Sequence, residues 1–141
     1  NGVTYAMSPM GADHTAGNCF GSRNEVNPRG RDQQGDLSKS LQYKMCTLDS
    51  LGFCIFARPP LFKDPTLMTK WVNALLGTEI SVDQLWETLG TNSIRTERDF
   101  NIRAGLSPAN DRLPEYVYVE PLPPTNELLD VTDHEMMKAV V

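Results

Sequence analysis

The chain has 141 residues, of which 40% are hydrophobic and 22% are charged, and its formal net charge is −5. This length and composition predict a single globular domain, residues 1–141, rather than a disordered or fibrous chain. The acidic balance offers no broad basic surface for a phosphate backbone, and no apolar run approaches the roughly 20 residues that cross a bilayer. We therefore expect neither a nucleic-acid nor a membrane partner.

Residues 1–35 are predicted to be irregular, because they are rich in glycine and short polar residues and show no sustained hydrophobic period. A stretch of this length without regular structure is usually functional or disordered. We therefore expect this segment either to wrap around a partner or to be loosely held.

A helix is predicted from Asp36 to about Leu48, because apolar side chains recur at helical spacing behind an acidic cap. They are Leu37, Leu41, Met45 and Leu48. Gly52 ends this pattern. The run from Phe53 to Ala57 is apolar on all sides, and we expect it to be buried before the proline pair that follows stops it.

A second helix is predicted after Asp64, which precedes a proline at the first helical position. Its wide apolar stripe ends at Gly77, a residue suited to a helix C-terminus. Trp71 lies on this stripe and is predicted to be a core residue.

A third helix is predicted from Ser81, because Ser81 and Gln84 have the spacing of a capping box. Its apolar stripe contains Trp86, which is also a predicted core residue. Gly90 is a candidate interruption, and residues 94–103 can carry the helix on towards Gly105.

Between Leu106 and Thr125, five prolines exclude a long helix and predict an extended strap, in which Tyr116–Val119 is a candidate short strand. The fold class is therefore mostly α: an irregular N-terminal segment, a helical domain and a proline-rich extended strap. A capping box at 132–135 opens a helix at the very end, and the chain starts without a methionine, so we expect a piece of a larger protein.

Asp49 and Cys54 place a carboxylate and a thiol five residues apart, around a glycine at which the chain can turn. A carboxylate accepts hydrogen bonds from heterocycles rich in N–H groups, and a thiolate binds soft metals such as the iron of a sulfur cluster. Taken alone the pair is weak evidence, because a cysteine in an apolar run is more often a small core residue.

The three cysteines, Cys19, Cys46 and Cys54, have neither the spacing of a disulfide framework nor that of a C-x-x-C zinc pair. A reducing, cytoplasmic location is the expectation that follows. Cys19 and Cys46 are expected to take no part in metal binding.

Three segments in order along the chain share a family pattern. The first is TYAMSPMGADHTAG at residues 4–17, the second is DSLGFC at residues 49–54, and the third is FNIRAG at residues 100–105, followed by DRLPE and EPLP at residues 111–115 and 120–123. Together they resemble the C-terminal part of the tungsten-containing aldehyde ferredoxin oxidoreductase family.

The resemblance implies a tungsten or molybdenum ion held by two pterin cofactors, with a 4Fe-4S cluster beside them. It implies that Cys54 is one of the four cluster thiolates, that Asp49 accepts hydrogen bonds from a pterin, and that Phe53 and Ile55 contact this cofactor. The family's other cluster cysteines form a C-x-x-C-x-x-x-C run in an earlier domain, and this chain has no such run. We therefore expect the chain alone to be inactive and to carry no cofactor, and its missing N-terminal and middle domains to be its partners.

The implied reaction of the full-length enzyme, which we expect to be a homo-oligomer, is the oxidation of a small aldehyde to a carboxylic acid with ferredoxin as electron acceptor. His14 is the candidate catalytic residue, because an imidazole exchanges protons near neutral pH and the resemblance places it near the metal. The alternative is a loop histidine bonded to its neighbours. Two other functions stay open: the same cofactors reducing an aromatic acyl-CoA, and a non-catalytic helical binding module.

Overall fold

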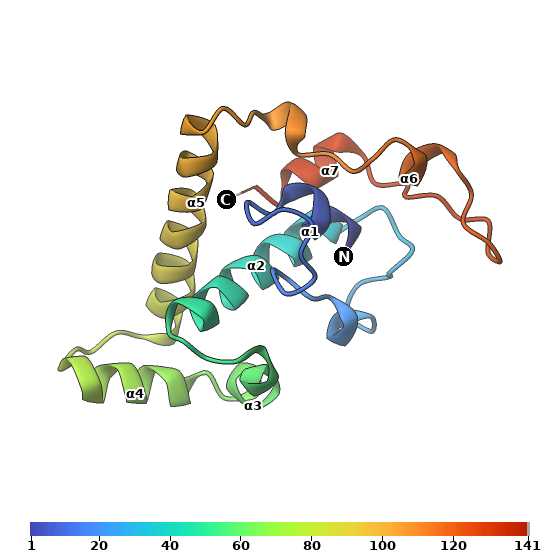
Figure 1. The fold of residues 1–141 in the computed structure, drawn as a ribbon. Helices are drawn as coiled ribbons and strands as arrows, with labels where there is room; N and C mark the ends of the chain where they lie inside the picture. Colours follow the sequence, from blue (N-terminus) through green and yellow to red (C-terminus); the bar gives the residue numbers. More distant parts are fainter. Residues whose placement is uncertain (141) are drawn as a thin grey trace.

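The computed structural model describes residues 1–140, which form a mostly helical fold, so the predicted class is confirmed (Figure 1). The α-helices are α1 (Gly2–Met7), α2 (Gln34–Ser50), α3 (Arg58–Lys63), α4 (Thr66–Leu76), α5 (Thr91–Arg103), α6 (Tyr116–Val119) and α7 (Asp133–Met137). Tighter 3₁₀ turns are η1 (Phe20–Ser22), η2 (Ile55–Ala57) and η4 (Pro108–Asn110), and η3 (Gln84–Gly90) is π-helical. Within residues 1–140, β pairing is limited to one isolated antiparallel bridge, between Leu122 and Glu127.

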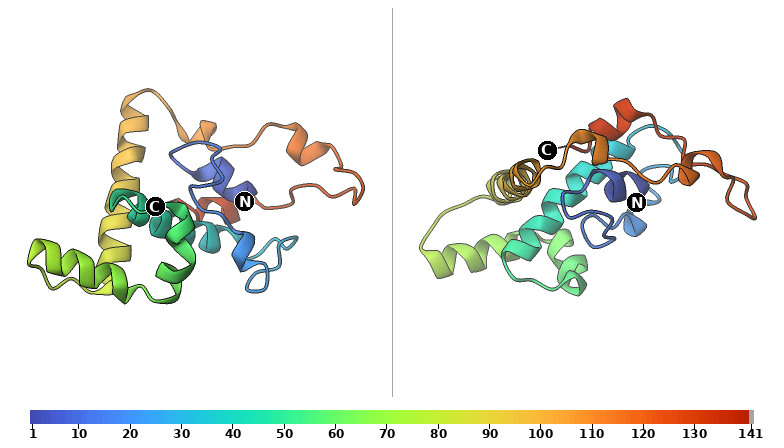
Figure 2. Two further views of the ribbon diagram at one scale, coloured as in Figure 1. Left: turned by 60° about the horizontal axis from the view of Figure 1, so that its bottom comes forward. Right: turned by 45° about the horizontal axis from the view of Figure 1, so that its top comes forward.

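Helix α2 is the central element, in contact with α1 and α7 on one side and with η3 and α5 on another (Figure 2). Two clusters of buried apolar side chains form the core. The first joins α1 to α7 and consists of Val3, Ala6, Met7, Met136 and Ala139. The second joins the end of α2 to α3, α4 and η3 and consists of Met45, Leu48, Leu61, Met68 and Leu85.

Buried polar contacts hold the N-terminal half of α2 in place. The hydroxyl oxygens of Thr4 and Ser38 are 2.7 Å apart, and the Gln42 amide donates to the same Ser38 oxygen at 3.1 Å. The Glu135 carboxylate accepts a hydrogen bond from the Gly35 backbone N–H at 3.1 Å, which ties α7 to the first turn of α2. Each of these contacts satisfies a polar group that would be costly to bury unpaired.

The predicted helix starts are confirmed where local side chains cap them. The Asp64 carboxylate accepts from the first backbone N–H of α4 at 3.2 Å. Ser81 and Gln84 exchange the two hydrogen bonds of a capping box, at 2.8 and 3.2 Å. Gly90 does not interrupt the third helix, because η3 continues directly into α5. Thr132 caps α7 by accepting from the Glu135 N–H at 3.2 Å.

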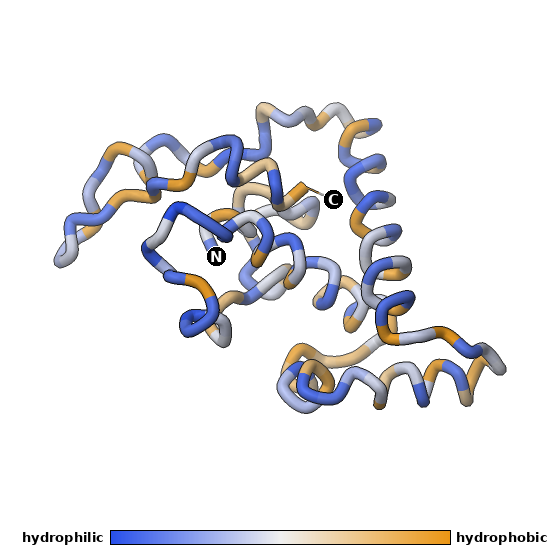
Figure 3. Tube along the Cα trace, turned by 180° about the vertical axis from the view of Figure 1, so that it is seen from behind, coloured by the Kyte–Doolittle hydropathy of each residue, from blue (hydrophilic) through white to orange (hydrophobic). Residues whose placement is uncertain are grey.

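The predicted burial of Phe53–Ala57 is wrong. Cys54 is exposed, Phe56 is 88% exposed, and the other three residues are half-buried. The run passes through η2 and packs against the outside of the second core cluster, so apolar character on all sides does not become burial. Figure 3 shows the hydropathy of each residue along the chain trace. Trp71 is likewise 51% exposed rather than a core residue, whereas Trp86 is half-buried.

Two local predictions are also wrong. Residues 1–35 contain helix α1, which packs against α7, more than a hundred residues further along the chain. A short sequence window does not include this stabilising contact, so the helix could not be predicted from local residues. Tyr116–Val119 forms α6 instead of a strand, because the chain turns back on itself through a hydrogen bond from the Val117 N–H to the Pro114 carbonyl at 3.1 Å. The sequence predicts an extended strap lying over the surface; the strap is extended, but around α6 it reaches out away from the other helices (Figure 1).

Candidate functional site

Asp49 and Cys54 lie on either side of the turn that ends α2. Gly52 adopts φ of +73°, a left-handed conformation that favours glycine. The turn is closed by hydrogen bonds from the Gly52 N–H to the Asp49 carbonyl at 3.0 Å and from the Phe53 N–H to the Leu48 carbonyl at 2.9 Å. This is the arrangement of a helix C-terminal cap, and it leaves the carboxylate on the last turn of α2 and the thiol beyond it.

Asp49 lines a pocket of about 270 Å³ between α2, α5 and the loop that follows α1. We call it the acceptor pocket. Its polar side chains from the helices are Gln42, Cys46, Asp49, Ser50 and Glu97. All of these except Cys46 carry oxygen acceptors and none is positively charged, so the pocket suits a ligand that offers hydrogen-bond donors.

Charge accumulates in the acceptor pocket. Partial burial raises the pKa of the Asp49 carboxyl, and the neighbouring Asp13 raises it further. Burial also raises the pKa of Glu97, with a further contribution from Asp49. The Cys46 thiol, whose pKa is raised by burial and then by Glu97, lies 3.9 Å from a Glu97 oxygen. A donor-rich ligand would offset this like-charge repulsion.

Gln42, which lines the same pocket, carries an unsatisfied acceptor. The residue is 2% exposed, and its amide nitrogen donates to Ser38. Its Oε1 has no hydrogen-bond partner among residues 1–140. A buried carbonyl oxygen left unpaired costs about 1–3 kcal/mol, which a bound donor would recover.

His14 and Ile55 line a second pocket, of about 680 Å³, which we call the His14 pocket. The Nδ1 atom of His14 lies 3.8 Å from the Asp13 carboxylate. Hydrogen bonds to Asp13 from the backbone N–H and the hydroxyl of Thr15, both at 2.7 Å, lower the pKa of this carboxyl. Asp13 is therefore held ionised beside the imidazole.

Cys54 lines neither pocket and is exposed at the surface. The ring of Phe53 packs against Trp71, with centroids 5.6 Å apart, so its side chain turns towards α4. Within residues 1–140, no three side chains of His, Cys, Asp or Glu come together as a metal-binding group. The structure thus brings His14 and Ile55 together, and it separates Asp49 and Cys54 by the turn.

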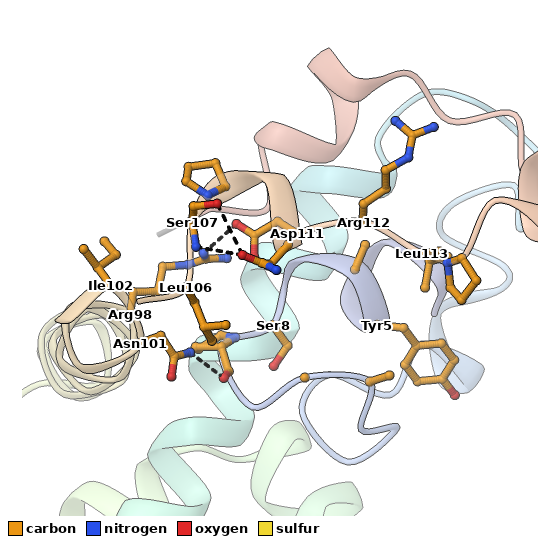
Figure 4. Close-up of a pocket in the computed structure, with 17 residues that line it drawn as sticks. Tyr5, Ser8, Arg98, Asn101, Ile102, Leu106, Ser107, Asp111, Arg112 and Leu113 are labelled. Atoms are coloured by element: carbon orange, nitrogen blue, oxygen red, sulfur yellow. Dashed lines mark hydrogen bonds and ion pairs between the residues drawn. The ribbon is translucent and has the colours of Figure 1, made fainter. Parts of the chain in front are cut away.

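Arg98 fixes the loop that leads to His14. Its guanidinium pairs with Asp111 at 3.0 Å, and Asn101 donates to the Pro9 carbonyl at 2.8 Å (Figure 4). The same guanidinium donates to the Met7 carbonyl. These contacts of Arg98 and Asn101 join α5, the strap and the end of α1 around a pocket of about 300 Å³. They position the loop, and no local sequence signal marks them.

Sequence reasoning also missed Gln42 and Glu97. A signal for the first was available, because Gln42, Cys46 and Asp49 recur at i, i+4 and i+7 and so share one face of α2. Glu97 comes from a helix 48 residues beyond Asp49, and only the crossing of α2 with α5 brings the two together.

These features define a mostly helical domain that offers an exposed thiol and a pocket of acceptors at the end of one helix. A family model described as aldehyde ferredoxin oxidoreductase, domains 2 and 3, matches residues 1–140. The chain belongs to the aldehyde ferredoxin oxidoreductase family. No curated protein and no solved structure matches it.

Membership of this family has two direct consequences. The match to domains 2 and 3 implies other domains in the same protein, and the family is one of oxidoreductases. Separately, none of the helices in residues 1–140 has the length and apolar character that crossing a membrane requires.

Proposed function

We propose that the chain supplies part of the cofactor site of a tungsten or molybdenum bis-pterin, 4Fe-4S oxidoreductase that oxidises small aldehydes to carboxylic acids and delivers the electrons to ferredoxin. Family membership supports the oxidoreductase class. The observation that carries the finer proposal is the turn at Gly52, which sets the Asp49 carboxylate in the acceptor pocket and leaves the Cys54 thiol facing outwards.

The acceptor pocket fits the donor-rich edge of a pterin. Asp49, Glu97 and the unpaired Oε1 of Gln42 are acceptors, and a pterin ring carries amino and ring N–H donors. In this proposal Asp49 is the principal acceptor. Phe53 contributes through its main chain, since its ring packs on Trp71, and Ile55 contributes its side chain.

Cys54 fits one ligand position of an iron–sulfur cluster. Its sulfur is a soft donor on the surface, and a cubane needs four such ligands. Since residues 1–140 hold no group of three metal-binding side chains, the other ligands must come from elsewhere in the protein. The domain numbering of the family match supports such a shared site.

Oxidation of an aldehyde to a carboxylic acid consumes one water and releases two electrons and two protons. The bound cofactors would accept the two electrons and pass them on singly. His14 would take up a proton at Nε2, because its Nδ1 faces Asp13. The ionised Asp13 then stabilises the resulting imidazolium, and water outside the pocket receives the proton.

The test compares Cys54→Ser with Cys46→Ser in the full-length enzyme. We expect Cys54→Ser to lower the iron content and to alter the electron paramagnetic resonance signal of the reduced cluster, because one thiolate ligand is lost. Cys46→Ser, which removes a thiol that lines the acceptor pocket, should leave both unchanged. A full complement of iron with an unaltered signal in Cys54→Ser would overturn the cluster assignment.

The acceptor role of Asp49 and the reaction need separate measurements. Asp49→Asn should lower the pterin content per chain, whereas Asp83→Asn, at an exposed position outside the pocket, should not. Assays of the unmodified enzyme with an aldehyde and ferredoxin, and with an aromatic acyl-CoA, decide between oxidation and thioester reduction. Activity with the thioester alone would contradict the proposed reaction.

A further inference from the structure

We propose that the His14 pocket binds an organic anion, a carboxylate or phosphate group carried on an apolar body. The pocket is the space of about 680 Å³ between α2, the η2–α3 segment and the loop at residues 14–25. This inference goes beyond the proposed function but shares two of its residues, because His14 and Ile55 line the pocket whereas Asp49 and Cys54 do not.

Two cations converge on one aromatic ring in this pocket. The Lys44 ammonium lies 5.9 Å from the centroid of the Phe62 ring, and the Arg58 guanidinium carbon lies 4.9 Å from it. Lys44 comes from α2 and Arg58 from the start of α3, so the convergence is tertiary. The ring attracts each cation but supplies no neutralising charge.

Neither cation has a carboxylate partner among residues 1–140 at ion-pair distance. The acidic residue of the lining is Glu25, which pairs with neither of them, and Asp13 is engaged by His14 and Thr15. In a chain of net charge −5, an unneutralised pair of half-buried cations is unusual.

Burial makes this charge costly. Desolvation lowers the pKa of Arg58, and its Nη1 donates to the Asn18 carbonyl at 2.7 Å. A neutral carbonyl does not offset the charge, whereas an anionic group bound in the pocket would make a charge-assisted hydrogen bond to Arg58 or to Lys44, which both line it. The electrostatics of the pocket therefore select an anionic group.

The rest of the lining selects an apolar body. The apolar side chains that line the pocket are Leu41, Ile55, Phe56, Pro59 and Phe62. Phe56 is 88% exposed, so its ring is free to contact a ligand. A volume of about 680 Å³ lies within the range of about 300–1,000 Å³ typical of small-molecule sites. One ring with a short chain to the anionic group fits this combination.

The test is calorimetric titration of the protein with three ligands of similar size: 3-phenylpropionate, phenyl phosphate and 3-phenylpropan-1-ol. We expect at least one anion to bind about tenfold or more tightly than the neutral alcohol, because only the anion makes a charge-assisted hydrogen bond to the cations of the pocket. The tighter of the two anions identifies the group as carboxylate or phosphate. Equal affinity for the alcohol and both anions would overturn the inference, as would no binding of any of them.

Variants locate the binding. Lys44→Gln should weaken binding of the preferred anion about tenfold, whereas Lys70→Gln, which removes the same charge from the exposed face of α4, should leave it unchanged. Arg58→Lys keeps the charge and should weaken binding less than Arg58→Gln. If the alcohol loses affinity in Lys44→Gln as much as the anion does, the lysine acts by packing and the charge reading is wrong.

Discussion

Gly90→Ala sets local helix propensity against tertiary packing. Gly90 is buried and has helical dihedral angles, φ −61° and ψ −45°. An alanine would suit this backbone, and helix propensity alone predicts a gain of about 1 kcal/mol in the free energy of unfolding. The structure predicts the opposite sign.

The added methyl group would collide with α2. A Cβ at Gly90 would lie 2.7 Å from the Thr47 hydroxyl and from the Tyr43 Cβ, and it would also contact the Tyr43 backbone carbonyl. Carbon contacts are normally about 3.5–4.0 Å. Because part of the obstacle is backbone, we take the upper end of the overpacking cost, about 3 kcal/mol. Offset by the propensity gain of about 1 kcal/mol, the net loss is about 2 kcal/mol.

Urea unfolding followed by circular dichroism measures this loss. For a chain of this size the same change should lower the Tm by about 6–8 °C. Gly21→Ala is the control, because a Cβ there meets nothing within 4 Å, and its effect should stay within about 0.5 kcal/mol. If Gly90→Ala were as stable as the unmodified chain or more so, the close packing of α2 against η3 would be wrong.

Three further outcomes are expected. The hydrogen bond from Lys138 lowers the pKa of Glu135 below its ordinary 4.5. The stabilisation is therefore present above pH 4.5 and is lost as the pH falls through the lowered pKa, so the urea midpoints of Glu135→Gln and the unmodified chain should differ above pH 5 and converge as the pH is lowered. Iodoacetamide followed by mass spectrometry should alkylate the exposed Cys54 before Cys46, whose pKa is raised by burial. Asp64→Ala should cost about 1 kcal/mol in urea unfolding through loss of the α4 cap.

What the sequence predicted well is what neighbouring residues decide. The starts of α4 and η3 were predictable because Asp64, Ser81 and Gln84 cap backbone groups within three residues of themselves. The same holds for the turn at Gly52, whose left-handed dihedral angle favours glycine. The side-chain chemistry at such positions is a local property and can be read from a short window.

Burial could not be predicted in this way, because it depends on what the rest of the chain places opposite a residue. The apolar run Phe53–Ala57 and Trp71 have the composition of core segments, yet the second core cluster is already closed by residues such as Met68 and Leu85, which are 0% and 1% exposed. The run therefore packs on the outside of that cluster. The amino-acid composition of the run makes it hydrophobic, but the arrangement of the helices decides that it stays exposed.

The candidate site shows the same division. The pattern from Asp49 to Cys54 indicates a carboxylate and a thiol at the end of a helix, and the structure has both there. It does not indicate that Glu97 shares the pocket of Asp49, nor that Arg98 holds the loop that carries His14. Both residues of α5 reach the site only through the tertiary crossing of helices.

Helix α2 lines both pockets. Gln42 and Asp49 face the acceptor pocket, while Lys44, on another face of the same helix, lines the His14 pocket. Gly90 sets how closely α5 approaches α2, and Glu97 follows Gly90 by two turns of helix. A methyl group at Gly90 would move α5 outwards, carry Glu97 away from Asp49 and reduce the repulsion between the two carboxylates. The close contact of Gly90 with α2 thus affects both the stability of the fold and the distance between the two carboxylates of the acceptor pocket. A ligand that stabilises the acceptor pocket must offset the repulsion between Asp49 and Glu97, which the packing of α2 against α5 brings together.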